Sequence, residues 1–274
     1  HLYILAFKPK RVNVRYMTLR RFEGKRILIT GGAGGIGGQI ARQFAEQGGR
    51  VGILDSNGSA IESIVSEIVT SGAVATGEQV DVRDQIAVEQ ATNKIANTLG
   101  GIDVLVTAAG GSLGTPRNLE EISSADLDLV LDVNIKGTFN CAKSVIPFMK
   151  NAGGGSIITF TSIGGRSASP VTGVPYAAAK AAILGLTRRL AKEVGEFNIR
   201  VNAIAPGLFL TDRLEGMFNQ MSAAERSEVL TAIPLGRMPT LKECADPVLF
   251  LASEESSYIT GIVLDVNGGR LMPN

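Results

Sequence analysis

Tyr176 and Lys180 are the pair of residues in this chain whose types and spacing most clearly suggest chemistry. They stand four positions apart in the segment GVPYAAAKAAILGL, so a helix would carry both on one face. A free tyrosine has a pKa near ~10 and is a poor acid or base at pH 7. A lysine ammonium one turn away stabilises the phenolate, lowers this pKa and suits the tyrosine to exchange a proton with an alcohol or carbonyl. The alternative is an exposed tyrosine beside a solvated lysine, because the spacing also arises by chance.

A glycine-rich segment, TGGAGGIG, occupies residues 30–37, after an apolar run and before a helical pattern. Glycines in this context let the backbone turn sharply and approach a pyrophosphate at a helix N-terminus. Asp55 ends the next apolar run, where an acid can accept both hydroxyls of an adenosine ribose. A carboxylate there repels a 2′-phosphate, and no Lys or Arg stands at 31–36 or 56–58, so these residues predict NAD rather than NADP. The alternatives are a turn with a solvated aspartate, or a loop that holds S-adenosylmethionine.

The composition excludes several other mechanisms. The only histidine is His1, which excludes a Ser-His-Asp triad, a histidine proton shuttle and a multi-histidine metal site. Cys141 and Cys244 are too few and too far apart for a thiolate zinc site, so we expect no metal. Two buried thiols are typical of a reducing compartment, and we expect a cytoplasmic protein. The net charge of +1 offers no overall electrostatic reason to expect nucleic acid as a partner.

The elements that must position these residues alternate along the chain. Short apolar runs predict strands at 25–30, 50–55, 73–80, 102–109, 156–162, 199–205 and 261–266. Helical patterns lie at 35–48, 58–71, 84–99, 123–150, 175–196 and 240–254. Several runs are apolar at consecutive positions, which is typical of parallel strands covered on both faces. The sequence therefore predicts a single α/β domain with a doubly wound, Rossmann-like parallel sheet of seven strands flanked by helices.

Two segments fall outside this alternation. Residues 1–24 form an N-terminal extension to a domain at 25–274, and we expect 1–16 to lie outside the natural fold. The extension is basic, so a targeting role stays open, but its apolar run at 2–7 is too short to cross a membrane. No run of 18 apolar residues occurs elsewhere in the sequence, so we expect no membrane association. Residues 208–237 are Met-rich with scattered charges and follow a predicted strand, which suggests a substrate lid.

Taken in order, these motifs resemble those of the short-chain dehydrogenase/reductase family, in its single-domain, NAD-preferring form, over about residues 25–270. TGGAGGIG is similar to the family's TGxxxGxG, and YAAAK is similar to its Tyr-Lys motif. The segments LDVNIKG and FTSIGG are similar to those that carry the family's catalytic asparagine and catalytic serine. The resemblance implies the catalytic residues Asn134, Ser162, Tyr176 and Lys180. It implies coenzyme contacts from Gly31, Gly34, Gly35, Ile36, Gly37, Asp55, Asp81, Val82, Thr107, Ala109, Gly110, Tyr176, Lys180, Pro206, Gly207, Phe209 and Thr211.

The resemblance also implies a role for each catalytic residue. Tyr176 exchanges a proton with the substrate oxygen while a hydride moves between the substrate carbon and the nicotinamide. Ser162 donates a hydrogen bond to that oxygen, Lys180 binds the ribose and lowers the pKa of Tyr176, and Asn134 fixes a water. The alternatives are that Asn134 satisfies a buried backbone group, that Ser162 merely ends a strand, and that Asp81 is a turn residue.

Two features depart from the family pattern. Its Asn-Asn-Ala-Gly is Thr-Ala-Ala-Gly at 107–110, which removes two amide side chains that would brace the sheet and the coenzyme ribose. The interval from Ser162 to Tyr176 is 14 residues, one more than the family spacing, so we expect one extra loop residue. Thr161 is the alternative hydroxyl.

The predicted lid and the long helices bear on substrate and assembly. An apolar set in and before the lid either lines a substrate pocket or packs as a helical stripe against the core: Phe209, Leu214, Met217, Phe218 and Met221. The resemblance implies a homotetramer, formed by the helices at 123–150 and 175–196 and by the C-terminal strand.

The leading hypothesis is an NAD-dependent dehydrogenase that acts on a secondary alcohol or its ketone. A 3-oxoacyl-carrier reductase that uses NADPH is the alternative, disfavoured by Asp55. A non-catalytic dinucleotide-binding module would be expected to lack the tyrosine, lysine or serine, and all three are present. A methyltransferase would leave Tyr176 and Lys180 unexplained, and the chain's length and histidine content exclude a zinc-dependent alcohol dehydrogenase. The motifs do not identify the substrate.

Overall fold

A parallel β-sheet forms the centre of the protein. The computed structural model of the chain describes residues 20–168 and 172–272. In these ranges seven strands pair in the order β3-β2-β1-β4-β5-β6-β7, each parallel to its neighbours. They are β1 (Arg26–Thr30), β2 (Arg50–Asp55), β3 (Ala75–Gln79), β4 (Val104–Thr107), β5 (Gly155–Phe160), β6 (Ile199–Pro206) and β7 (Val263–Val266). The prediction of a doubly wound, seven-stranded α/β fold is confirmed.

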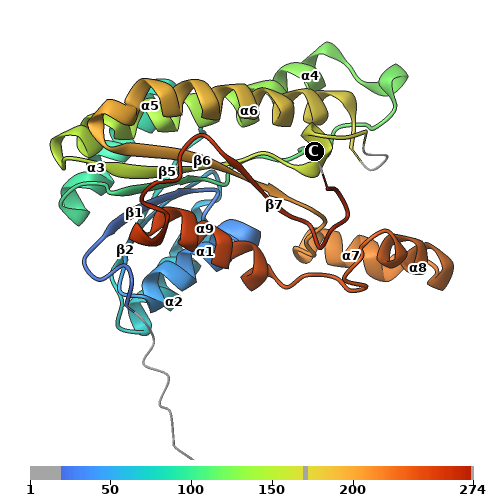
Figure 1. The fold of residues 1–274 in the computed structure, drawn as a ribbon, viewed down its shortest axis with the longest axis horizontal. Coiled ribbons are helices and arrows are strands. Elements are labelled where there is room, and N and C mark those ends of the chain that lie inside the picture. The colour runs from blue at the N-terminus through green and yellow to red at the C-terminus, as the bar shows by residue number, and fades with distance from the viewer. Residues whose placement is uncertain (1–19, 169–171, 273–274) are drawn as a thin grey trace, which may run out of the picture.

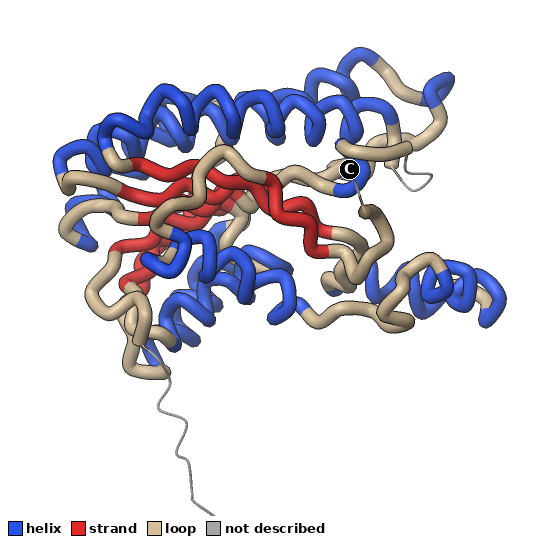
Figure 2. The backbone as a smooth tube through the Cα atoms, in the orientation of Figure 1, coloured by secondary structure: helices blue, strands red, loops and turns tan. Residues whose placement is uncertain are grey.

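Helices cover both faces of the sheet (Figures 1 and 2). The α-helices are α1 (Gly35–Glu46), α2 (Gly58–Thr70), α3 (Gln85–Leu99), α4 (Ser124–Leu131), α5 (Gly137–Asn151), α6 (Val174–Val194), α7 (Asp212–Gln220), α8 (Ala223–Thr231) and α9 (Leu241–Ala252). One hydrophobic cluster joins the sheet to α1, α2 and α9, and a second joins it to α3, α5 and α6. The short helices are η1 (Leu119–Glu121), η2 (Asp132–Lys136), η3 (Ile163–Gly165), η4 (Gly195–Phe197) and η5 (Glu254–Ser256).

The consecutive apolar residues of the strands divide between these two clusters. In β1, Ile27 and Ile29 face the cluster with α1 and α9, whereas Leu28 faces the cluster with α3 and α5. All three side chains are fully buried. Successive strand residues point to opposite faces, so a strand covered on both sides needs apolar residues at every position.

The structure differs from the predicted elements in two places. The helix predicted at 123–150 is divided, because the π-helix η2 separates α4 from α5. The predicted lid at 208–237 contains two short helices, α7 and α8, which lie beyond the end of β6, at the right of Figure 1. Most of the predicted N-terminal extension, residues 1–19, lies outside the described residues.

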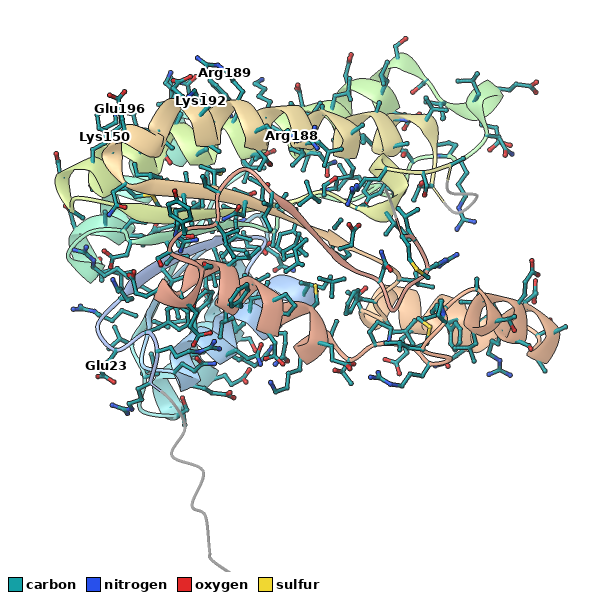
Figure 3. The ribbon with its side chains drawn as sticks, in the orientation of Figure 1. Glu23, Lys150, Arg188, Arg189, Lys192 and Glu196 are labelled. Carbon is teal, nitrogen blue, oxygen red and sulfur yellow. The ribbon has the colours of Figure 1, made fainter. Side chains whose placement is uncertain are left out.

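The outer surface of α6 is strongly charged. Arg188, Arg189 and Lys192 lie along it, with Glu196 beyond the end of the helix (Figure 3). Throughout residues 20–168 and 172–272, every helix is too short or too polar to cross a lipid bilayer.

Candidate active site

The glycine-rich segment connects β1 to α1 and forms one wall of a cleft of about 730 Å³. A side chain at Gly37 would collide with the carbonyl oxygen of Gly31, so this turn requires glycine. Gly34 is the N-cap of α1 and provides no capping side chain. The first amides of α1 are therefore free of side-chain caps, the arrangement that suits a bound phosphate.

Asp55, at the end of β2, is held against this loop. One carboxylate oxygen, Oδ2, accepts a hydrogen bond of 3.1 Å from the backbone amide of Ala33. The other, Oδ1, accepts one of 3.1 Å from the amide of Asn57. Both oxygens keep further lone pairs, and the side chain lines the cleft. The carboxylate is thus oriented by backbone donors at the position where the sequence predicts a ribose.

The far end of the cleft carries a charged pair that the sequence reasoning missed. Asp81 lies beyond the end of β3, as predicted, but its carboxylate already binds the guanidinium of Arg83, with a shortest distance of 2.6 Å. These hydrogen bonds hold the pKa of Asp81 below its usual value. The buried amide of Asn140 donates 2.9 Å to the carbonyl of Val82 and fixes the backbone between them. The sequence DVRD, in which an aspartate and an arginine stand two residues apart, could have indicated this ion pair.

The cleft brings together most of the predicted coenzyme contacts. It is lined by Gly31, Gly34, Gly35, Ile36, Gly37, Leu54, Asp55, Ser56, Val80, Asp81, Val82, Arg83, Ala108, Ala109, Gly110, Leu113, Leu129, Val133 and Thr211. A dinucleotide needs a phosphate cradle, an acid for a ribose and an apolar slot for an adenine. One cleft provides all three in order: the glycine loop, then Asp55, then the segment at 80–82. The residues therefore fit a nicotinamide dinucleotide.

Lys180 and Tyr176 lie near the amino end of α6, beside the end of β5. The Lys180 side chain is 5% exposed, and its ammonium donates 2.9 Å to the carbonyl of Phe160. Burial lowers the pKa of Lys180 to about 8. The ammonium lies 5.7 Å from the centre of the Tyr176 ring. The predicted pair therefore shares one helix face and one environment.

The predicted lowering of the pKa of Tyr176 by Lys180 does not appear in this structure. Burial of the phenol raises the pKa, and a hydrogen bond with Ser162 opposes this only in part. The reason is that burial disfavours the charged phenolate. As it stands, the site keeps Tyr176 protonated at neutral pH.

Ser162 follows β5 and caps the short helix η3. Its hydroxyl accepts a hydrogen bond of 3.1 Å from the amide of Gly164. The alternative hydroxyl, that of Thr161, is buried and donates 2.6 Å to the carbonyl of Lys180. Thr161 thus joins β5 to α6, and Ser162 is the hydroxyl that interacts with Tyr176.

Asn134 lies in the π-helix η2 and is 1% exposed. Its side-chain oxygen accepts 3.0 Å from the amide of Gly111, and its nitrogen donates 2.9 Å to the carbonyls of Gly111 and Val130. Gly110 has φ +149°, and a side chain there would collide with the Asn134 oxygen. Asn134 therefore satisfies buried backbone groups and at the same time clamps the loop that follows β4.

The substitution of Thr-Ala for the family's two asparagines leaves a polar atom unsatisfied. The hydroxyl of Thr107 is buried and has no hydrogen-bond partner in the described part of the chain. The loop is held instead by Asn134 and by Thr30, whose hydroxyl accepts 3.3 Å from the amide of Ala109.

The segment after β6 reaches the cleft through only some of its predicted contacts. Gly207 donates 2.9 Å from its amide to the carbonyl of Val266, which aligns the segment with β7. Thr211 lines the cleft. Phe209 is 3% exposed and belongs to the core, so its side chain does not face the cleft.

Among the predicted apolar lid residues, Phe209 lines a second pocket of about 280 Å³, together with Leu208, Ile233 and Leu235. Phe218 and Met221 are half-buried, and neither lines the cleft. The side chains of Leu214 and Met217 lie outside the described residues.

No group of three His, Cys, Asp or Glu side chains in the described ranges could hold a metal ion.

Comparisons with known proteins identify the family. The family model described as enoyl-(acyl carrier protein) reductase matches residues 31–270. The 3-oxoacyl-[acyl-carrier-protein] reductase FabG of Thermotoga maritima is 38% identical, over 92% of this chain and 100% of that protein. The 2-dehydro-3-deoxy-L-rhamnonate dehydrogenase (NAD(+)) of a Sphingomonas species is 34% identical, over 91% and 96%. The chain is a short-chain dehydrogenase/reductase.

A solved structure supports the same assignment for the fold. The 3-oxoacyl-[acyl-carrier protein] reductase of Brucella melitensis with bound NAD superposes with a TM-score of 0.84 and 34% identity, covering 100% of this chain and 99% of that one. This short-chain dehydrogenase/reductase is thus an oxidoreductase of CH–OH groups that uses a nicotinamide dinucleotide.

Proposed function

We propose that this short-chain dehydrogenase/reductase uses NAD and interconverts a secondary alcohol and its ketone, with Tyr176 as acid and base. The observation that carries the proposal is the cluster of Tyr176, buried Lys180 and Ser162 at the carboxyl end of β5. The cleft that contains Asp55 supports the choice of coenzyme.

The coenzyme supplies the redox step, because the nicotinamide ring accepts or donates the hydride. The glycine loop would hold its pyrophosphate, Asp55 the ribose hydroxyls, and Asp81 with Val82 the adenine. Backbone at 107–110 and the segment at 206–211 would lie along its nicotinamide half.

Tyr176 and Ser162 act on the substrate. In the oxidation, Tyr176 as phenolate takes the hydroxyl proton while the carbinol carbon gives up its hydride, so a ketone forms and the tyrosine becomes a phenol. In the reduction, the phenol returns the proton to the oxygen. Ser162 donates a hydrogen bond to the same oxygen as its charge develops. Because burial raises the pKa of Tyr176, we expect oxidation to gain rate as pH rises above neutral, and reduction to be favoured at lower pH.

Lys180 and Asn134 support this exchange. The ammonium of Lys180 would bind the nicotinamide ribose and so hold the coenzyme beside Tyr176. Since the pKa of Lys180 is about 8, this support declines above that pH. Asn134 orders the loop at 110–111 and would fix a water through which protons exchange with solvent.

The coenzyme choice is tested by titrating the protein with NADH and NADPH, following nicotinamide fluorescence and melting temperature. We expect NADH to bind at least about tenfold more tightly, or roughly 1.4 kcal/mol, and Asp55→Asn to abolish most of that difference. Glu62→Gln, an exposed acid on α2, is the matched control and retains it. Tighter binding of NADPH to the unmodified protein would contradict the proposal.

The alternative is reduction of a carrier-linked 3-oxoacyl chain, and curated relatives carry that name. One such reductase has been solved with bound NAD, so coenzyme preference alone does not separate the two functions. The discriminating assay offers NADH with 3-oxoacyl thioesters and, separately, NAD with a panel of secondary alcohols. Turnover confined to the thioesters would replace the leading proposal.

We also propose a homotetramer. Support comes from apolar side chains left on the surface of the described chain, including Phe139 on α5 and Tyr258 and Ile262 before the edge strand β7. Light scattering after gel filtration measures the assembly, and a monomer would refute the proposal.

A further inference from the structure

An ion pair connects the loop that carries Ser162 to the edge strand β7. Arg166 directly follows the short helix η3, whose N-cap is Ser162. Its guanidinium Nη1 binds the carboxylate Oδ2 of Asp265. The two side chains are only 17% and 24% exposed, so this is not a solvated surface pair.

The pair crosses the end of β6. Asp265 lies opposite Ala205 in the register of β6 and β7, one position before Pro206. Because β6 lies between β5 and β7, Arg166 reaches from the end of β5 across the end of β6 to its outer neighbour. The amide of Gly207 donates to the carbonyl of Val266, the residue after Asp265. The ion pair therefore joins the serine loop to the strand that aligns the segment at 206–211.

The other side of the serine loop is fixed by close packing. A side chain at Gly165 would come within 2.5 Å of the backbone of Lys180, so the loop lies directly on α6. Packing sets the loop against Tyr176 and Lys180, whereas Arg166 is its side-chain connection to β7. The ion pair also orients the Asp265 carboxylate, because its second oxygen, Oδ1, is buried and has no partner within the described ranges.

We propose that Arg166 and Asp265 are positioning residues that fix the distance between the Ser162 hydroxyl and the nicotinamide segment at 206–211. The proposal rests on the function proposed above, in which Ser162 orients the substrate oxygen. Hydride transfer needs reacting atoms about 3–3.5 Å apart, and a misplacement of about 1 Å can cost about a hundredfold in rate. The pair thus sets the reaction geometry without touching substrate.

The first test replaces Arg166 by Met. We expect kcat to fall roughly ten- to a hundredfold, while KM and the NADH dissociation constant change by less than about twofold, because the coenzyme contacts remain. The primary isotope effect with NADH deuterated at the transferred position should increase, since hydride transfer becomes rate-limiting. Arg166→Lys, which keeps the charge, should recover part of the lost rate.

A second readout does not depend on turnover. Amide hydrogen exchange of peptides covering 161–168 should accelerate in Arg166→Met, because the loop loses its connection to β7. The double variant Arg166→Met with Asp265→Leu removes both charges and leaves no unpaired carboxylate, so it should fold and still show the low kcat and fast exchange.

The matched control lies at the opposite end of the sheet. Arg26 and Asp103 form an ion pair of the same burial, 24% and 17% exposed, far along the strands from the serine loop. Arg26→Met should lower the melting temperature to a similar degree and leave kcat within about twofold. Equal kcat in Arg166→Met and the unmodified protein, or normal exchange at 161–168 in the double variant, would overturn the proposal. Failure of the unmodified protein to bind NADH or turn over any substrate would instead refute the proposed function.

Discussion

Arginine side chains connect neighbouring elements at both ends of the sheet, but the cleft and the catalytic residues lie at the carboxyl end. At the amino end, Arg26 binds Asp103 through two nitrogens at 2.7 and 2.5 Å. Arg200 donates 2.8 Å to the carbonyl of Leu251 and also binds Ser256. At the carboxyl end, buried oxygens of Thr107 and Asp265 lack partners in the part of the chain that the structure describes.

This difference shows where the fold gives up stability for chemistry. Polar atoms that contact a ligand cannot also be fully satisfied within the protein, so a binding site holds desolvated groups at a cost in stability. Lys180 is the clearest example, as a buried ammonium that no carboxylate pairs among the described ion pairs. We therefore expect variants at the carboxyl end to change activity and stability independently, and variants at the amino end to change stability with little effect on activity.

The largest effect is expected for Tyr176→Phe. Removing the hydroxyl removes the proton donor and acceptor, and we expect kcat to fall about 10²–10⁴-fold, with NADH binding retained. Tyr258→Phe is the control, because that tyrosine is fully exposed. A Tyr176→Phe enzyme with more than a tenth of the normal rate would contradict the role given to the phenol.

A glycine at each end separates backbone strain from steric collision. Gly110 and Gly100 both have positive φ, but only at Gly110 would a side chain meet another group, the Asn134 oxygen. We expect Gly100→Ala to lower the free energy of unfolding by about 1–2 kcal/mol, and Gly110→Ala by roughly 1–3 kcal/mol more. Denaturant titrations measure both, and NADH binding should weaken only in Gly110→Ala. Equal losses of unfolding free energy in the two variants would show that the Asn134 side chain moves aside at little cost.

Replacing Lys180 by Met should stabilise the protein while it impairs activity. The amine binds its proton below pH 10.5 when unfolded and below about 8 when folded. Between these values the unfolded state binds more protons, so native stability rises with pH, and the cost of burying the charge is fully present below about pH 8. We expect Lys180→Met to gain up to about 3 kcal/mol at pH 7, and the gain to shrink from pH 8 to 10.

The control for this prediction is Lys192→Met, on the exposed face of α6 (Figure 3). It should change the free energy of unfolding by less than about 0.5 kcal/mol at either pH. A Lys180→Met protein less stable than the unmodified one at pH 7 would mean that the hydrogen bond to Phe160 outweighs the burial of the charge.

The smallest effect is expected at Thr107. Its buried hydroxyl has no partner in the described residues, so Thr107→Val should leave stability unchanged or raise it by about 1 kcal/mol. Thr159→Val, in the neighbouring strand, should cost about 1–2 kcal/mol because that hydroxyl bonds to Thr187 at 2.7 Å. Thermal unfolding distinguishes the two. A clear loss of stability in Thr107→Val would reveal a partner, such as an ordered water.

The parts of this molecule that sequence could predict are those set by local patterns. Consecutive apolar residues mark the buried strands, and the spacing of Tyr176 and Lys180 places them on one helix face whatever surrounds them. Burial around Tyr176 depends on the assembled fold, so the direction of its pKa was not predictable from Lys180 alone. The pairing of Arg166 with Asp265 spans 99 residues, and no local pattern specifies it.

The helices at 208–237 were missed for a related reason. The one helix there whose side chains are all described, α8, buries none of them, so packing imposes no apolar stripe for a pattern to reveal. Its capping box, Ser222 with Glu225, was the available signal. No comparable sequence pattern indicated the π-helix at Asn134, because the inward orientation of that side chain depends on its hydrogen bond with the loop after β4.

That π-helix has a consequence for how the gene can vary. A π-turn holds one residue more than an α-turn, so η2 acts as an insertion that shifts the phase of α4 relative to α5. Deleting one residue within 132–136 would restore a continuous helix but rotate one half by about 100° relative to the other. Either the buried face of α5 or Val130 of α4 would then turn to solvent. A one-codon deletion in this stretch is therefore incompatible with the fold.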